Sequence, residues 1–317
     1  MLTTKPKAIT NREFIESATM FYIDADLEKE FEQKVSAIVS NTINGVKLLP
    51  KINTVDGLEQ YINGDEDSLY QIISLLNISK ERFKRVITML RIQKKHCVTN
   101  EWDLPKIREQ LLSDPLLMHD VCELLINGAM LDKYKSLIPS FFLENFTIDA
   151  YTLGRLTSAD DIRRLTKKRV EGDYNNKIGD SFFNKVQKYI TRICDKQGLK
   201  YAIKKNIPII GRQVGIAIPD ESSPRLLIDI TYSITTSSTQ TDYAKIAEKT
   251  ADKIRELNEN KPDEQKIVLV YVVDGVGWIA RQSDLNKIER CSNYLLNLKS
   301  LKTIHDIINY YFDGGVK

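Results

Sequence analysis

Apolar residues in the first half of the chain recur every three or four positions, the period of a helix that buries one face. The pattern predicts helices over residues 28–43, 67–76, 80–92, 103–113, 115–127 and 158–170. Ser79 stands directly before the third of these segments, where its hydroxyl can cap the first turn. The first half is therefore expected to be helical throughout.

The periodicity changes after residue 170. Residues 177–194 still have the pattern of an amphipathic helix, and three strand-like segments follow, over 199–205, 212–218 and 225–233. A helix is predicted over 242–257, an apolar strand over 266–273 and a closing helix over 301–312. Because the segments at 225–233 and 266–273 flank a helix, we expect them to pair in parallel through a right-handed crossover.

This change predicts two domains, residues 1–168 and residues 169–317. Residues 1–150 carry 18 Lys and Arg against 22 Asp and Glu, whereas residues 151–317 carry 28 against 21. The basic second half is compatible with a polyanionic partner. Positive charge is concentrated in residues 79–95, with seven basic residues and one acid, and in residues 155–169, with six and two.

Several classes of protein are disfavoured by composition and motifs. The four cysteines are scattered without a C-x-x-C pair, which disfavours a disulfide scaffold or a zinc ribbon. The apolar run at 267–273 is too short to span a membrane, and the N-terminus has no apolar signal segment, so we expect a cytoplasmic protein. Residues 274–278, DGVGW, lack the glycine spacing of a nucleotide site. We interpret them as a tight turn with Trp278 packed beneath it and expect no nucleotide cofactor.

The helices predicted at 67–76 and 80–92 are separated by three residues and form a candidate helix-turn-helix. The second of them is strongly basic. We expect DNA contacts from five of its side chains: Lys80, Arg82, Lys84, Arg85 and Arg91. A helical hairpin with a solvated charged face produces the same pattern, so both interpretations stay open.

One acid interrupts an otherwise apolar strand. Asp229 lies within LLIDIT, and a carboxylate at such a position must be paired, hydrogen-bonded or bound to a metal. Asp220 precedes it across the turn PDESSP, so a hairpin could bring the two carboxylates together. Two carboxylates with phosphate and water oxygens suit Mg²⁺. A satisfied core acid at Asp229 and a plain turn aspartate at Asp220 are the alternatives.

The segment order, the stretch PDESSPRLLIDITYS and the later VLVYVVDGVGW resemble the core of type II restriction endonucleases of the PD-(D/E)xK superfamily. The end of the chain, VDGVGWIARQSDLNKI and NLKSL, is similar to restriction enzymes that cut at GATC sites. The resemblance covers residues 170–317. It implies an α/β nuclease core, a mixed sheet flanked by helices, after an all-α N-terminal region.

The superfamily motif is an aspartate followed, on the next strand, by an acid and a lysine separated by one residue. In the first register, Asp220 matches the first aspartate and Asp229 the acid, and both would hold the metal. Thr231 then stands at the lysine position, which is a departure because threonine supplies no ammonium.

In the second register, Asp229 is the first acid, Ser238 the degenerate acid and Gln240 the terminal polar residue, since some members carry glutamine there. The segment between the two elements contains no clear hairpin turn. Lys245, on the helix that follows, is a third candidate for the lysine, with a solvated surface lysine as its alternative. Asp229 belongs to both registers.

The resemblance implies a Mg²⁺-dependent, sequence-specific endonuclease that hydrolyses double-stranded DNA, within a restriction-modification system and as a homodimer. A non-catalytic DNA-binding protein with a degenerate nuclease fold is the alternative. A protein-interaction module with merely solvated basic faces is a third. Cleavage that needs Mg²⁺ and binding that weakens with salt would distinguish them.

Overall fold

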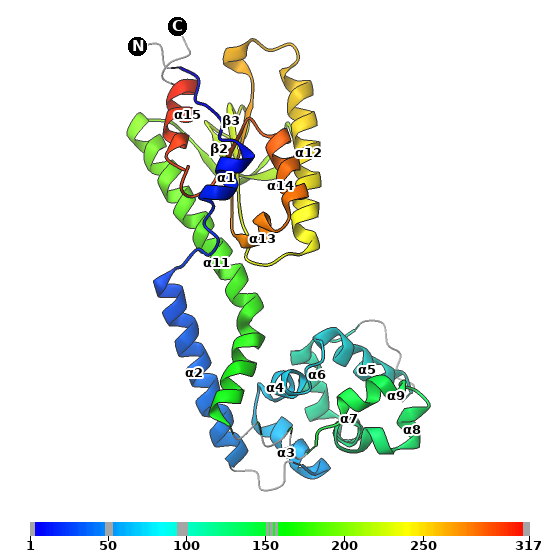
Figure 1. Ribbon diagram of the computed structural model, residues 1–317. Helices are drawn as coiled ribbons and strands as arrows, with labels where there is room; N and C mark the ends of the chain where they lie inside the picture. The colour runs from blue at the N-terminus through cyan, green and yellow to red at the C-terminus, as the bar shows by residue number, and fades with distance from the viewer. Residues whose placement is uncertain are drawn as a thin grey trace. The chain divides into compact units, whose positions relative to one another are not determined.

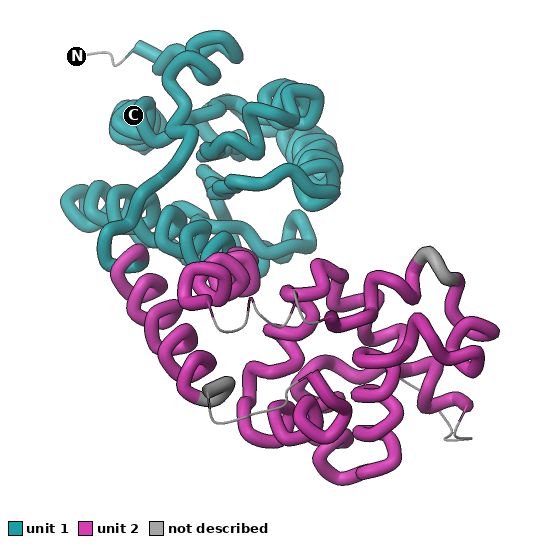
Figure 2. The backbone as a smooth tube through the Cα atoms, turned by 60° about the horizontal axis from the view of Figure 1, so that its bottom comes forward, with its two compact units in different colours: residues 1–27, 174–317 teal, residues 28–173 magenta. Residues whose placement is uncertain are grey.

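The computed structural model describes residues 4–47, 53–93, 101–149, 152, 155 and 158–312. The chain forms two compact units, each drawn in its own colour in Figure 2. Unit 1 comprises Met1–Leu27 and Tyr174–Lys317, and unit 2 comprises Glu28–Asp173. The division lies close to the predicted one at 168/169, but residues 1–27 pack with the C-terminal part instead of with the helices that follow them.

Unit 2 is helical in every element that the structure describes. Its helices are α2 (Ala25–Lys47, which begins in unit 1), α3 (Val55–Gly64), α4 (Ser68–Leu75), α5 (Lys80–Gln93), α6 (Leu104–Ser113), α7 (Pro115–Asn127), α8 (Asp132–Lys135), α9 (Ser140–Leu143) and the first part of α11 (Ala159–Gln197). Side chains at helical spacing, such as Phe83, Ile87 and Leu90 of α5, are buried in one apolar cluster. The helices predicted at 103–113 and 115–127 are confirmed.

Helix α5 begins where the sequence predicts. The Ser79 hydroxyl accepts a hydrogen bond from the Arg82 N–H at 3.1 Å, which satisfies one of the free donors of the first turn. Asn77, in the short connection from α4, adopts a left-handed conformation with φ of 53°. Asparagine tolerates this conformation better than most residues.

Unit 1 contains a five-stranded mixed sheet in the order β1-β2-β3-β4-β5. The strands are β1 (Ala202–Ile207), β2 (Arg212–Ile218), β3 (Leu226–Tyr232), β4 (Val268–Asp274) and β5 (Tyr294–Leu296). β1, β2 and β3 pair antiparallel, whereas β3, β4 and β5 pair in parallel. The predicted parallel crossover from β3 to β4 is confirmed, and all seven residues of β4 are buried, as expected of a central strand.

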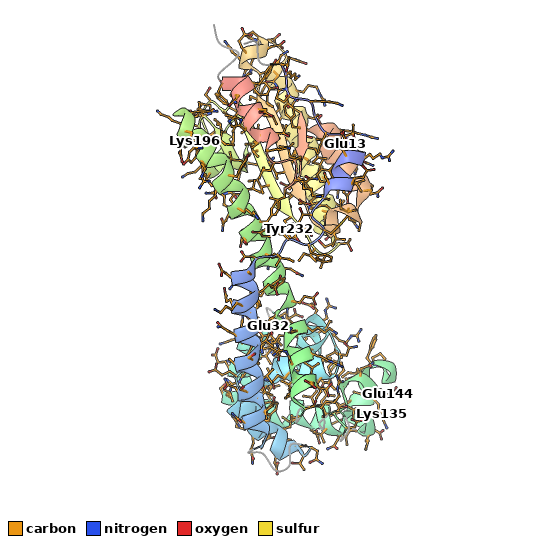
Figure 3. All side chains as sticks on the ribbon, turned by 60° about the vertical axis from the view of Figure 1, so that its left-hand side comes forward. Glu13, Glu32, Lys135, Glu144, Lys196 and Tyr232 are labelled. Carbon is orange, nitrogen blue, oxygen red and sulfur yellow. The ribbon has the colours of Figure 1, made fainter. Side chains whose placement is uncertain are left out.

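Helices cover both faces of this sheet (Figure 1). On one face, α12 (Ser238–Asn258) and α14 (Gln282–Cys291) bury apolar side chains against β3 and β4, among them Ala244, Ala247 and Leu285. On the other face lie the C-terminal part of α11 and α15 (Thr303–Phe312), where Phe182 stacks on Tyr232 with ring centroids 5.1 Å apart. Figure 3 labels Tyr232 beside α11.

The N-terminal residues complete unit 1. Phe14 of α1 (Asn11–Ser17) is fully buried in the cluster beneath α12 and α14. The Asn297 amide donates to the Phe14 carbonyl oxygen at 3.0 Å and to the Ser17 hydroxyl at 2.7 Å. The Tyr22 N–H donates to the Tyr232 hydroxyl at 2.6 Å. Residues 14–22, far from the sheet in the sequence, are therefore packed into the core of unit 1.

Two helices predicted separately, at 158–170 and 177–194, are one helix of 39 residues, α11. The intervening EGDYNN is polar, which suggests a break, but it contains no proline and Gly172 alone does not end a helix. A polar helical stretch is stable when both of its ends are packed. Among the described elements, the pattern does not anticipate the helices α1, α3, α8, α9, α13 and α14 or the three-residue strand β5.

The segment DGVGW turns sharply after β4, as predicted, and continues into the short helix α13 (Val276–Ile279). A Cβ on Gly275 would lie 2.3 Å from the Ser233 carbonyl oxygen, and one on Gly277 would lie 2.4 Å from that of Thr235. Both glycines are therefore required by the loop that leaves β3. Trp278 is 1% exposed and packs beneath the turn. In the part of the chain that the structure describes, no helix could cross a membrane.

Candidate functional site

Asp229 lies in the middle of β3 with its side chain toward α12. It is 6% exposed. Its carboxylate forms an ion pair with the Arg212 guanidinium and accepts a hydrogen bond from the Gly215 N–H at 3.1 Å. A buried carboxylate with these partners meets the requirement of a satisfied core acid.

Arg212 opens β2 and ties the pair to the helix above it. Its guanidinium also donates to the Thr250 hydroxyl of α12 at 2.7 Å and to the Gln213 carbonyl oxygen at 2.8 Å. Burial lowers the pKa of Arg212, but the charge of Asp229 and the hydrogen bond to it outweigh burial and leave the pKa above its ordinary value. The guanidinium is therefore a permanent positive charge beside Asp229.

Two tyrosines, Tyr243 and Tyr271, lie near the ion pair of Arg212 with Asp229. Burial raises the pKa of Tyr243 and of Tyr271, and the charge of Asp229 adds to the effect in both. Their ring centroids lie 6.0 Å apart in an edge-on arrangement. The carboxylate of Asp229 is thus surrounded by one cation and two neutral phenols.

The register of β2 explains why no second acid stands beside Asp229 on that strand. Ile216 pairs with Ile228, so the next position along β2, opposite Asp229, is Gly215. A Cβ on Gly215 would lie 2.9 Å from the Ile228 carbonyl oxygen, closer than real Cβ atoms approach. A side chain of any kind is excluded here unless the strands move apart.

Asp220 is not brought to this position. It lies in the turn between β2 and β3, where its carboxylate accepts from the Ser222 N–H at 2.9 Å and the Ser223 N–H at 2.8 Å. The Ser222 hydroxyl and these N–H groups lower the pKa of Asp220. Leu226 is the first residue of β3 and the paired residue nearest the turn. Asp229 lies three residues further along the strand, roughly 10 Å from Leu226 at strand rise. Asp220 is the plain turn aspartate of the alternative interpretation.

Magnesium does not fit the residues around Asp229. The ion favours several oxygen ligands in octahedral geometry, and a pair of carboxylates is the usual protein contribution. Here the one carboxylate already neutralises Arg212, and its strand neighbour is a glycine. Within the described residues, no group of three or more acidic, histidine or cysteine side chains could hold a metal ion. The described contacts give no support to the prediction that Asp229 and Asp220 converge on a metal, and metal binding by Asp229 stays a prediction.

The residues of the second register organise a helix start. Gln240 is 2% exposed, and its amide nitrogen donates to the Ser233 hydroxyl at 3.0 Å and to the Thr235 carbonyl oxygen at 2.5 Å. Its amide oxygen accepts from the Ser237 N–H at 2.8 Å, which completes a capping box for α12. Gln240 thus holds the loop that leaves β3.

Ser238, the degenerate acid of that register, and Lys245, the separate candidate for the lysine, are exposed on α12. Ser238 is the first residue of the helix. The Lys245 ammonium lies 3.6 Å from the Asp242 carboxylate, and its side chain is 60% exposed. This pair is an ordinary surface contact between residues three apart in a helix. Neither residue contacts Asp229.

Asp274 is a buried, hydrogen-bonded acid that the sequence analysis did not identify as a candidate site residue. It ends β4, is fully buried and accepts hydrogen bonds from the N–H groups of Thr19, Gly275 and Leu298 at 2.7, 3.0 and 2.9 Å. Burial raises its pKa, and these hydrogen bonds oppose the shift. An aspartate between an apolar strand and G-x-G was the available signal. Its partners show that it joins the N-terminal residues to the sheet.

The predicted DNA contacts on α5 have different surroundings. Lys84 forms an ion pair with Glu101 at 3.0 Å. The Arg82 guanidinium lies 4.8 Å from the centre of the Phe142 ring, and the Lys80 ammonium 5.1 Å from that of Tyr70. Arg85 follows Lys84 in the sequence and is exposed.

Arg91 does not reach the surface. It is 5% exposed and packs over the Trp102 ring, because it stands on the apolar side of α5 near Leu90. The prediction that Arg91 contacts DNA is therefore wrong for this structure. For Lys80, Arg82, Lys84 and Arg85, DNA contact stays a prediction.

The element order of unit 1 defines the class of the domain. A helix, three antiparallel strands, a crossover helix and a parallel strand, with helices on both faces of the sheet, form a restriction-endonuclease-like α/β fold. Residues 173–307 match the family model described as DpnII restriction endonuclease. This match supports a type II restriction endonuclease in the C-terminal half of the chain. A search of curated proteins found no match.

The matched residues begin in α11 and end in α15. They include the whole sheet, the Arg212–Asp229 pair and Asp274. They do not include α1, which packs into the same core, or the helices α2 to α9 of unit 2.

Proposed function

We propose that the protein is a type II restriction enzyme that binds double-stranded DNA and hydrolyses its phosphodiester bonds at a specific sequence. The observation that carries this proposal is the family match over residues 173–307, which spans the complete sheet. A homodimer belongs to the proposal, because a two-fold protein matches a palindromic site that is cut in both strands. The resemblance makes GATC the first site to test.

Magnesium enters this proposal through the family alone. When bound, Mg²⁺ supplies charge neutralisation at the phosphate and a water of lowered pKa. The surroundings of Asp229 do not fit the ion, so the role of this residue is derived without it. Asp229 holds Arg212 in place between β2 and α12 and balances its charge.

A second candidate is a non-catalytic DNA-binding protein with a degenerate nuclease fold. The ion pair of Arg212 with Asp229 favours it, because the guanidinium stands beside the carboxylate that a metal would need. Thr231 at the lysine position and Gly215 opposite Asp229 point in the same direction. Such a protein binds DNA through its basic surfaces and leaves the backbone intact.

The test incubates the full chain with supercoiled plasmid DNA that contains unmethylated GATC sites, with Mg²⁺ or with EDTA. The first proposal expects discrete fragments with Mg²⁺ and none with EDTA. The second expects a mobility shift of the DNA in both conditions and no fragments. A protein that neither shifts nor cuts the DNA refutes both.

An Asp229→Asn variant guards against a contaminating nuclease. Its cleavage is compared with its folded fraction, measured by thermal unfolding of the same preparation. If cleavage falls only in proportion to the folded fraction, Asp229 is a structural acid, as its contacts indicate. A much larger fall would assign it to the catalytic centre.

A further inference from the structure

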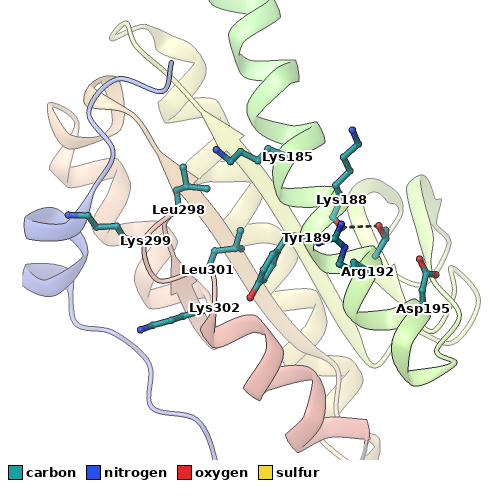
Figure 4. A pocket seen from close by; sticks show the side chains of 10 residues that line it. Lys185, Lys188, Tyr189, Arg192, Asp195, Leu298, Lys299, Leu301 and Lys302 are labelled. Carbon is teal, nitrogen blue, oxygen red and sulfur yellow. Dashed lines mark hydrogen bonds between the residues drawn. The ribbon is translucent and has the colours of Figure 1, made fainter. Parts of the chain in front are cut away.

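Unit 1 carries a basic groove on the face of the sheet opposite to α12. The groove has a volume of about 770 Å³ and lies between α11 and the segment that joins β5 to α15 (Figure 4). Its basic residues are Lys185, Lys188 and Arg192 of α11, and Lys299 and Lys302 of the joining segment. Asp195 is the one acid that lines it.

Within the described residues, none of these five cations forms an ion pair with a carboxylate, although the charge of Lys185 contributes to the lowered pKa of Asp24. Asp195 lies near Arg192 but interacts with the Tyr201 hydroxyl. By contrast, exposed cations of α12 are paired: Lys253 with Glu256 at 3.1 Å and Arg255 with Asp252 at 2.9 Å. The protein therefore balances the positive charge of the groove less completely than that of these two α12 cations.

The spacing of the groove residues on α11 is unfavourable without an anion. Lys185 and Lys188 are three residues apart, and Lys188 and Arg192 are four apart, so like charges are neighbours on one helix face. Each such pair destabilises the helix. A polyanion in the groove would convert this repulsion into attraction.

We propose that this groove binds the phosphate backbone of double-stranded DNA. Lys185 to Arg192 spans seven helical residues, about 10 Å, so these cations can reach more than one phosphate of a strand whose charges recur about every 3.4 Å along the duplex axis. Tyr189, 38% exposed, lies among these cations and has a hydroxyl that can donate to a phosphate oxygen. The cations from the joining segment supply the second wall.

This inference rests on the proposed function, since it names a surface by which the protein holds its DNA. It also separates binding from the Asp229 pair. The groove lies on the α11 face of the sheet, whereas Asp229 and Arg212 lie beneath α12. DNA binding through the groove is therefore expected to be independent of Asp229.

The test measures binding of the full chain to a fluorescent mixed-sequence DNA duplex across a series of salt concentrations. The groove variant is Lys188→Gln with Arg192→Gln. The matched control is Lys253→Gln with Arg255→Gln on α12, which removes the same charge from exposed and paired positions.

The groove variant is expected to bind several-fold more weakly and to lower the slope of log affinity against log salt by about 1.8, or about 0.9 per lost phosphate contact. The control variant is expected to keep the slope of the wild type. Because like charges are removed, the melting temperature of the groove variant at low salt is expected to equal or exceed that of the wild type.

If the wild type binds DNA and the groove variant keeps its affinity and slope, the groove inference is wrong and the proposed function stands. If the wild type binds no DNA, the proposed function is wrong and the groove inference falls with it. Binding to vesicles of anionic lipid that is lost in the groove variant, with DNA binding unchanged, would assign the groove to a membrane surface instead.

Discussion

The ion pair of Arg212 with Asp229 gives a prediction in which a structural acid and a metal ligand behave differently. We expect Asp229→Asn to destabilise unit 1. Asparagine keeps the shape of the side chain and can still accept the hydrogen bond from the Gly215 N–H. It removes the negative charge that balances Arg212, whose other contacts tie β2 to α12 through Thr250.

The expected size of the effect follows from burial. Removing one partner of a buried ion pair costs about 3–5 kcal/mol of unfolding free energy, because the other charge is left uncompensated. The Asp229 side chain is 8% exposed and that of Arg212 is 22% exposed, so water reaches part of the guanidinium. We therefore expect a loss of about 3 kcal/mol for Asp229→Asn. The loss for Arg212→Met is expected to be larger, since the better buried charge then remains alone.

Urea unfolding of the wild type, both single variants and the double variant at neutral pH measures this directly. A loss of about 3 kcal/mol lowers the urea midpoint by about 1 M or more. The double variant is expected to lose less than the sum of the single variants, since no lone charge remains. Glu256→Gln is the control, because its pair with Lys253 is exposed and is expected to contribute below about 1 kcal/mol.

The reasoning is refuted if Asp229→Asn unfolds at the same urea concentration as the wild type. A measurement with Mg²⁺ separates the two roles further. If the ion raises the urea midpoint of the wild type and not that of Asp229→Asn, then Asp229 is a metal ligand, and the pair with Arg212 opens to admit it. The structure predicts no such shift, because the carboxylate is already neutralised.

Two further predictions concern the turn after β4. Asp274→Asn is expected to cost about 1–3 kcal/mol at neutral pH, since the amide nitrogen would face the Leu298 N–H and leave a buried donor unsatisfied. The pKa of Asp274 is raised in the folded state, so its carboxyl stabilises the fold most below the ordinary pKa of 3.8. This contribution falls as pH rises through the folded pKa. Urea unfolding across acidic pH should show this dependence in the wild type and not in the variant. Gly277→Ala is expected to lower the melting temperature strongly, because its Cβ would lie 2.4 Å from the Thr235 carbonyl oxygen. The control is Gly172→Ala within α11, which has open space around it and is expected to stabilise by about 0.5–1 kcal/mol. Equal melting temperatures for these two variants would contradict this account.

Much of the fold was predictable because its signals are local. An apolar run with no polar face predicts a central strand, and β4 is one. The crossover rule then gives the parallel pairing of β3 with β4. The continuity of α11 was not predictable, because it depends on packing at both ends of the helix and not on the polar residues between them.

The candidate site was predictable only in part. An acid in an apolar strand identified Asp229 as a residue with a buried partner. The sequence could not name the partner, because Arg212 is adjacent only through the antiparallel register of β2 with β3. The same register places Gly215, and not Asp220, opposite Asp229. A hairpin that includes a loop of several residues does not fix this register by itself.

The packing of α1 into unit 1 has a consequence for synthesis of the chain. Unit 2 is an insertion between two parts of one domain, since unit 1 takes residues from before Glu28 and after Asp173. As the chain leaves the ribosome, unit 2 can fold before Phe14 meets its hydrogen-bond partner Asn297, which is translated after unit 2. The core of unit 1 is therefore completed only after unit 2 has been translated.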